Sequence, residues 1–182
     1  MNRRHFQLGV ALAGFAFATL AAAAAPPEPP GYRLDNYQSP TPDTFNGEPA
    51  LSVDAAKATW ADPKTLFIDV LPHPPRPEGL PEGTVWHEKP HVGIARSIWL
   101  PEVGRGALAP ETEAYFRRSL DEITGGDKGA ILVFYCKRAC WMSWNAAKRA
   151  ASMGYSRVRW YSDGIEGWRE AGLPTETIAP RP

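Results

Sequence analysis

The sequence predicts an α/β domain with a mainly parallel sheet flanked by helices and preceded by a proline-rich arm. Two observations lead to this prediction. Short apolar runs, typical of buried strands, alternate along the chain with stretches of helical spacing, and that order is typical of a parallel α/β sheet. Proline is also unusually frequent, with 19 among 182 residues, which limits long helices and implies extended segments.

The predicted elements follow one another from residue 50 onward. Asp54 is the expected N-cap of the first helix, and Gly125 and Gly154 are expected to end the second and third. The expected strands lie at 51–53, 65–70, 95–100, 130–135 and 158–161, and the expected helices at 55–61, 110–123, 141–153 and 165–170.

Residues 1–25 indicate an export signal. Arg3 and Arg4 precede an apolar stretch without an acidic residue, and alanines then offer a cleavage site. The two arginines resemble a twin-arginine signal, and general secretion is the alternative. A permanent membrane anchor is a third reading, but the stretch is only weakly hydrophobic. We therefore expect a periplasmic protein that is free of the membrane after cleavage.

The proline-rich arm covers residues 26–49 and carries seven prolines. Such a segment cannot form a regular helix or a central strand. Its apolar side chains are expected to pack as an extended arm against a globular domain at 50–178. These side chains are Tyr32, Leu34, Tyr37 and Phe45.

Composition excludes several classes of protein. Lys and Arg together number 20, and so do Asp and Glu, without a block of like charges. A nucleic-acid-binding protein normally carries a basic patch, so no nucleic acid is expected as a partner. Two cysteines cannot build a disulfide-dense scaffold.

The chemistry is expected in the loop that holds the chain's two cysteines, Cys136 and Cys140. A buried strand leads into Cys136 and a helix follows soon after, so ligands would meet the free N–H groups and the positive dipole end of that helix. Lys137 and Arg138 add positive charge. Together these groups are expected to lower the pKa of Cys136 and to stabilise a thiolate, a persulfide or a bound oxyanion.

Other readings of the two cysteines remain open. Cys136 alone could be a buried, inert side chain, but its partner four residues later favours a nucleophile with a resolving thiol, or a disulfide. His87 and His91 could join them as metal ligands. Pro90 lies between the two histidines and argues against a common helix face, so we expect no metal.

Several segments resemble the rhodanese-like sulfurtransferase family. The resemblance covers about residues 50–178, and Leu71 stands where that family usually has arginine. The similar segments are the opening at 51–53, the "IDVR" strand at 67–70, the "HIPGA" segment at 91–95, the active-site strand and its cysteine at 133–136, and the C-terminal motif at 163–174.

The resemblance implies roles for the cysteine loop. Cys136 would carry a persulfide cradled by backbone amides, and a basic residue late in the loop would bind the anionic sulfur donor. Here Ala139 replaces a common glycine, and the late basic residue is missing, which puts thiosulfate as the substrate in question. The expected catalytic residues are Cys136 and Cys140, and the expected substrate-binding residues are Lys137, Arg138, Ala139, Trp141 and Met142.

The signal, the arm and the Cys-x-x-x-Cys-Trp loop resemble more closely the PQQ-dependent catabolism-associated CXXCW motif proteins, a rhodanese-like branch. This resemblance implies sulfane-sulfur transfer or thiol redox chemistry in support of periplasmic quinoprotein-dependent alcohol catabolism. It implies no cofactor, a small sulfur donor or acceptor, and a PQQ-dependent dehydrogenase or cytochrome c as protein partner. The alternative is a non-catalytic binding or assembly module with a Cys136–Cys140 disulfide.

Overall fold

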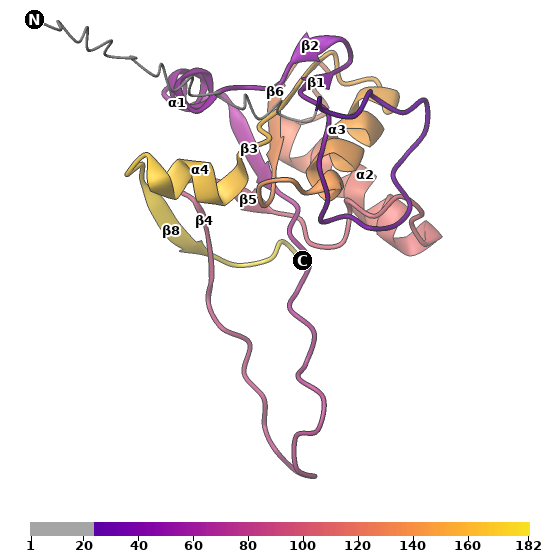
Figure 1. Ribbon diagram of the computed structural model, residues 1–182, viewed down its shortest axis with the longest axis vertical. Coiled ribbons are helices and arrows are strands. Elements are labelled where there is room, and N and C mark those ends of the chain that lie inside the picture. The colour runs from indigo at the N-terminus through magenta and orange to yellow at the C-terminus, as the bar shows by residue number, and fades with distance from the viewer. Residues whose placement is uncertain (1–23) are drawn as a thin grey trace, which may run out of the picture.

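A four-stranded parallel sheet forms the centre of the protein (Figure 1). The computed structural model describes residues 24–182, so the expected export signal lies almost entirely outside the described residues. The strands run in the order β5–β3–β6–β7 and every neighbouring pair is parallel, which confirms the predicted fold class. They are β3 (Leu66–Asp69), β5 (Ile98–Trp99), β6 (Ile131–Tyr135) and β7 (Arg157–Trp160).

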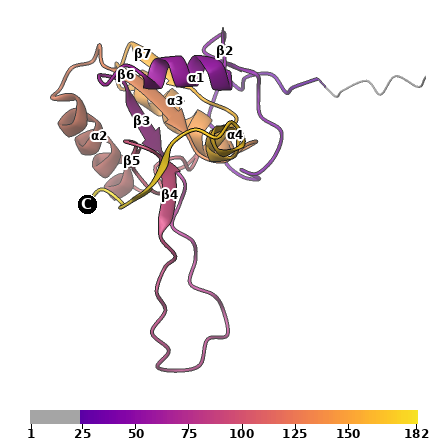
Figure 2. The same cartoon turned by 90° about the vertical axis from the view of Figure 1, so that its left-hand side faces the viewer.

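Helices cover both faces of this sheet (Figure 2). Successive strand residues point to opposite faces, so Leu132 and Phe134 belong to one apolar core and Val133 and Tyr135 to the other. Cys136 continues the alternation into the first core, on the side of the third helix. The helices are α1 (Val53–Trp60), α2 (Pro110–Thr124), α3 (Trp141–Ser152) and α4 (Gly164–Glu170).

The first helix begins earlier than the sequence predicts. Its N-cap is Ser52, whose hydroxyl accepts a hydrogen bond from the Ala55 N–H at 3.2 Å, rather than Asp54. The expected strand at 51–53 is wrong, because Leu51 only donates its N–H to the Trp160 carbonyl before the chain turns into α1. The second helix ends at Gly125, as predicted, with a φ of +62°.

A long loop projects from the body between β3 and β4 (His91–Ile94) in both views (Figures 1 and 2). It comprises the second proline-rich stretch, residues 72–90. At its base β4 pairs antiparallel with β8 (Thr175–Ile178), a pair that the sequence does not predict. The side chains at 175–177 are exposed, so no apolar alternation marks that strand.

The proline-rich arm follows the outside of α3 (Figure 1). It carries a small hairpin of β1 (Thr44–Phe45) and β2 (Glu48–Pro49). Phe45 is buried against the Trp144 ring, whereas Leu34 remains 66% exposed, unlike the expectation. Among residues 24–182, no helix is long and apolar enough to cross a membrane.

Candidate active site

Cys136 follows the last residue of β6 and is completely enclosed. Its sulfur faces three oxygen atoms, the Ser143 hydroxyl at 3.2 Å, the Cys140 carbonyl at 3.6 Å and the Lys137 carbonyl at 3.7 Å. Carbonyl oxygens can only accept hydrogen bonds. This environment therefore favours the protonated thiol.

The Ser143 hydroxyl is held in one orientation by its neighbours. It accepts a hydrogen bond from the Trp160 indole N–H at 3.0 Å and donates to the Cys140 carbonyl at 3.2 Å. Since its proton is used in this way, the oxygen is left to accept from the Cys136 thiol. Both Ser143 and Trp160 are buried, so water does not compete for these groups.

Cys140 occupies the N-cap position of the 12-residue helix α3. Its pKa is lowered to about 7, first by the neighbouring Cys136 side chain and then by the backbone amides of Met142, Lys137 and Ser143. These effects outweigh burial, which acts in the opposite direction. Both cysteines are free thiols in this structure.

The expectation that the loop lowers the pKa of Cys136 is wrong. Burial raises that pKa well above its ordinary value, and the neighbouring Cys140 sulfur raises it further. The helix amides act on Cys140 because α3 begins at Trp141, directly after it. The Ser143 backbone amide lowers the pKa of both cysteines, whereas those of Met142 and Lys137 act on Cys140.

Arg138 points away from the cysteines. Its guanidinium group makes hydrogen bonds of 2.6 and 3.0 Å to the Glu170 carboxylate and lies 3.6 Å from that of Asp163. Its backbone N–H donates to Glu166 at 3.0 Å. Three carboxylates near α4 therefore neutralise the Arg138 charge. The sequence predicts this charge beside the thiols instead.

Ala139, Trp141 and Met142 form the wall of the loop. Ala139 adopts the left-handed conformation with a φ of +52°, the region that glycine favours. Trp141 and Met142 are buried, and the Trp141 indole N–H donates to the Ser39 hydroxyl and the Pro40 carbonyl, both at 3.1 Å. Their placement is that of packing residues around the thiol pair.

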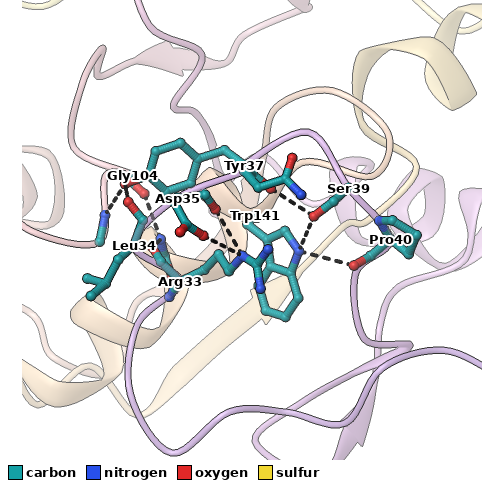
Figure 3. A network of polar contacts seen from close by, with 11 residues as sticks. Arg33, Leu34, Asp35, Tyr37, Ser39, Pro40, Gly104 and Trp141 are labelled. Atoms are coloured by element: carbon teal, nitrogen blue, oxygen red, sulfur yellow. Dashed lines mark hydrogen bonds and ion pairs between the residues drawn. The ribbon is translucent and has the colours of Figure 1, made fainter.

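Arm residues surround Trp141, which directly follows Cys140 (Figure 3). Gln38 forms an antiparallel bridge with Cys140, and its side-chain amide donates to the Arg138 carbonyl at 2.7 Å. The Trp141 N–H donates to the Tyr37 carbonyl at 2.9 Å. The loop therefore obtains backbone partners from a segment about one hundred residues earlier in the chain.

Asn145 anchors the arm to α3. Its side-chain oxygen accepts from the Arg33 N–H at 2.9 Å, and its amide group donates to the carbonyls of Arg33 at 2.8 Å and Gly104 at 3.0 Å. The Arg33 guanidinium lies 5.6 Å from the centre of the Trp141 ring (Figure 3). These contacts keep the thiol pair covered.

Helix α4 fixes the loop from the other side. The Ile165 N–H donates to the Cys136 carbonyl at 2.9 Å. Gly164 has a φ of +57°, and a Cβ atom there would stand 2.5 Å from the Cys136 carbonyl oxygen. Only glycine allows so close an approach between α4 and the cysteine loop.

Asp69 and His91 form a second polar pair at the end of β3. The Asp69 carboxylate lies 2.9 Å from His91 Nε2 and accepts the Leu71 N–H at 2.9 Å, while the His91 ring stacks on Trp99 at 4.0 Å. These bonds give Asp69 a structural role at its strand end. In the described part of the chain, no group of three or more His, Cys, Asp or Glu side chains is placed to hold a metal ion.

A groove of about 520 Å³ lies beside Lys137. One wall comes from the projecting loop and the other from α4. Basic side chains on both walls make it suitable for an anion, although two glutamates also contribute. The charged and histidine residues that line it are His73, Glu88, Lys89, His91, Lys137, Glu166 and Arg169.

Residues 52–171 match the rhodanese-like domain family over most of the globular body. The chain belongs to the rhodanese-like domain family. This membership is consistent with a sulfurtransferase. No curated protein matches the sequence.

Solved structures that are similar to this rhodanese-like chain come from several organisms. The Alr3790 protein from Anabaena sp. shares 16% identity over 69% of this chain and 79% of its own, with a TM-score of 0.45. An uncharacterized protein from Saccharomyces cerevisiae shares 22% identity over 68% and 92% of the two chains, with a TM-score of 0.42. The human single-domain sulfurtransferase TSTD1 shares 19% identity over 68% and 97%, with a TM-score of 0.43.

In this rhodanese-like domain the structure brings Cys136 and Cys140 together and leaves Arg138 outside. Sequence reasoning missed Ser143 and Trp160. Ser143 lies three residues after Cys140, within the first turn of α3, and that spacing is the only signal that could have indicated it. Nothing in the sequence indicates that Trp160, at the end of β7, reaches the same hydroxyl.

Proposed function

We propose that this protein is a sulfurtransferase whose Cys136–Cys140 pair accepts sulfane sulfur as a persulfide and passes it to a thiol. The observation that carries the proposal is the pair itself, two neighbouring thiols at the carboxyl end of the central strand of a rhodanese-like domain. One of the two has a pKa of about 7, so a thiolate is available near neutral pH.

Transfer takes place in two displacement steps. A thiolate of the pair attacks the outer sulfur of a thiosulfate-like donor, a sulfur–sulfur bond forms, and sulfite leaves with the electron pair of the broken bond. The thiolate of an acceptor then attacks the outer sulfur of the persulfide, and the cysteine leaves as a thiolate. The groove beside Lys137 is the proposed approach for the anionic donor.

Thiol–disulfide exchange is a second candidate function, favoured by the contact between the two thiols. One thiolate would attack a disulfide of a partner to give a mixed disulfide, and the second thiol would resolve it. The partner would leave as a dithiol, and Cys136 and Cys140 would remain as a disulfide. This chemistry needs both cysteines, whereas sulfur transfer needs one.

The cellular setting is part of the proposal. Residues 1–25 read as an export signal and the Cys-x-x-x-Cys-Trp loop is similar to that of proteins associated with PQQ-dependent catabolism. We propose a periplasmic protein that supports quinoprotein-dependent alcohol oxidation, with a PQQ-dependent dehydrogenase or a cytochrome c as partner. Fractionation of cells that express the full chain tests the location, and recovery only from the cytoplasm would contradict it.

The intact mass of the purified protein tests the chemistry. After treatment with thiosulfate the wild type should gain the mass of one sulfur atom, and the variant with both cysteines replaced by serine should gain none. A mass two hydrogens short, unchanged by the donor, would favour thiol–disulfide exchange. No change under either an oxidant or a sulfur donor would contradict both candidates and leave a binding module.

A further inference from the structure

We propose that the open edge of the central sheet, at β7, binds an extended acidic segment of a partner protein as an added strand. This surface is separate from the groove beside Lys137, with which it shares no lining residue. The proposal rests on free backbone groups along β7, on two exposed arginines and on a groove beside them. It does not depend on sulfur transfer.

The outer edge of β7 offers backbone groups to a further strand. β7 is the last strand of the sheet and pairs only with β6. The Tyr161 N–H donates to the Phe134 carbonyl of β6, whereas the Trp160 carbonyl accepts the Leu51 N–H on the opposite side. Because backbone groups alternate in direction along a strand, the N–H and C=O of Val158 also face outward. In the described part of the chain these two groups have no backbone partner.

Arg157 and Arg159 place positive charge on one face of this edge. They lie in register with Ile131 and Val133 of β6, so their side chains project on the face of the sheet that packs against α1. Both are exposed, and neither takes part in an ion pair with any residue that the structure describes. Opposite charges on neighbouring strands stabilise their pairing. The two arginines therefore favour acidic residues in the added strand.

A groove of about 880 Å³ lies beside this edge and gives the added strand room. One wall comes from β7, and α1 contributes the small side chains of Ala55, Ala58 and Thr59. Small side chains leave space for the backbone of a peptide. The β1–β2 hairpin supplies a further wall, and its Glu48 is the only acidic residue among the described residues that line the groove.

The alternation of a strand predicts the pattern of the occupant. Successive residues point to opposite faces, so residues opposite Arg157 and Arg159 would share the face of α1. The residue between them would lie opposite Val158, which packs against the apolar core that contains Phe45. An apolar side chain suits that position. We therefore expect an extended segment in which acidic and apolar residues alternate, bound by addition to the sheet edge.

A second copy of this chain is a poorer occupant of the same edge. Pairing of two β7 strands would bring Arg157 and Arg159 of both copies together, and like charges on neighbouring strands destabilise the pairing. Charged residues on a free edge also protect it from aggregation. The same arginines thus oppose self-association and select for an acidic partner.

Binding of labelled peptides to the purified full chain tests the proposal. The probe is a fluorescent peptide of alternating glutamate and valine. One control peptide carries lysine in place of glutamate, and another keeps the glutamates but has methylated backbone nitrogens, which cannot donate to a sheet edge. We expect fluorescence anisotropy to rise with the first peptide alone.

Each other result would overturn part of the proposal. Equal binding of the methylated peptide would exclude strand addition, and equal binding of the lysine peptide would exclude recognition of acidic residues. Failure of the acidic peptide to bind would overturn the proposal and leave the arginines as protection of a free edge. The readout is binding alone, so loss of sulfur uptake would not affect it.

Charge reversal locates the binding site on the protein. Arg157→Glu combined with Arg159→Glu should weaken binding of the acidic peptide by about tenfold and should allow the lysine peptide to bind. Both side chains are exposed, and thermal unfolding checks that the variant folds. The matched control is Arg117→Glu combined with Arg118→Glu, which changes the net charge equally on the exposed side of α2. Equal weakening in the control would show a general charge effect and overturn the assignment of the site to β7.

Discussion

Ser143 connects three buried groups through one hydroxyl, since Trp160 donates to it, the Cys140 carbonyl accepts from it, and the Cys136 thiol lies 3.2 Å away. We expect Ser143→Ala to reduce the free energy of unfolding by about 1–3 kcal/mol, because the Trp160 N–H and the Cys140 carbonyl lose their partner in the core. Urea titration measures this loss. The matched control is Ser156→Ala, where the hydroxyl is exposed. Equal losses of unfolding free energy in the two variants would show that the buried Ser143 hydroxyl stabilises the fold no more than an exposed one.

Gly164 sets the distance between α4 and the cysteine loop. We expect Gly164→Ala to be destabilising by about 1–3 kcal/mol and to slow sulfur uptake, because the added Cβ would displace the Cys136 carbonyl. Gly172→Ala is the control, since Gly172 has a similar φ of +66° but open space around it. The comparison separates the steric clash of the new Cβ atom at Gly164 from the cost of a positive φ, which both variants share. A loss of stability and uptake no larger than in Gly172→Ala would contradict the prediction.

The cysteine loop also shows what residue patterns can and cannot predict. The sequence predicts a strand, a loop with two cysteines and a helix, and it predicts a thiolate near the helix N-terminus. Which cysteine benefits depends on the exact start of α3 and on the left-handed Ala139. Both are settled by tertiary contacts with the arm and α4, and no local pattern in the sequence encodes those contacts.

At the scale of elements, the arm is the part that controls access to the thiols. We expect Asn145→Ala to loosen it, because three hydrogen bonds to Arg33 and Gly104 disappear. A loss of about 1.4 kcal/mol in local stability raises the open fraction tenfold. The rate at which a neutral alkylating reagent modifies the cysteines at pH 7 should rise by about that factor.

Leu34→Ala is the control for the arm prediction, because that side chain is exposed and belongs to the same segment. Limited proteolysis should show earlier cleavage between residues 30 and 40 in Asn145→Ala than in the control. Unchanged alkylation and proteolysis would mean that the other arm contacts hold the segment without Asn145.

Elements with a strong apolar period could be predicted from the sequence, and those without one could not. The apolar run at 130–135 and the helical spacing at 110–123 predict elements that the structure confirms as β6 and α2. The strand at 175–178 has mostly exposed side chains, and it exists because its backbone pairs with β4. Its hydrogen bonds are made with a strand more than eighty residues earlier, so local sequence offers no cue.

For the whole molecule, the two cysteines predict a stability maximum in mild alkali. The pKa of Cys140 in the folded protein is about 7, below the unfolded value of about 8.5, so its contribution is complete above pH 8.5 and is lost as pH falls toward 7. The pKa of Cys136 is raised in the folded protein. Its contribution to the unfolding free energy is therefore present below pH 8.5 and is lost at higher pH. Unfolding free energy should therefore rise from pH 7 to about 8.5 and then fall.

Variants separate the two contributions. Cys140→Ser should abolish the rise, which we expect to be about 1–2 kcal/mol, and Cys136→Ser should reduce the fall. Urea titrations of the wild type and both variants across this pH range measure the differences, so that other titrating groups cancel. A rise that persists in Cys140→Ser would assign it to another group.

The contacts of the arm also predict the order in which the molecule assembles. Its contacts join residues that are far apart in the chain, with Arg33 and Asn145 separated by 112 positions and Ser39 and Trp141 by 102. Closing loops of this length costs entropy that only a nearly complete sheet and α3 can offset, so the arm docks late in folding. The segment that leaves the ribosome before the domain is thus fixed last. Until then we expect Cys140, which bridges to Gln38 of the arm, to stay open to oxidants, and docking of the arm ends that interval.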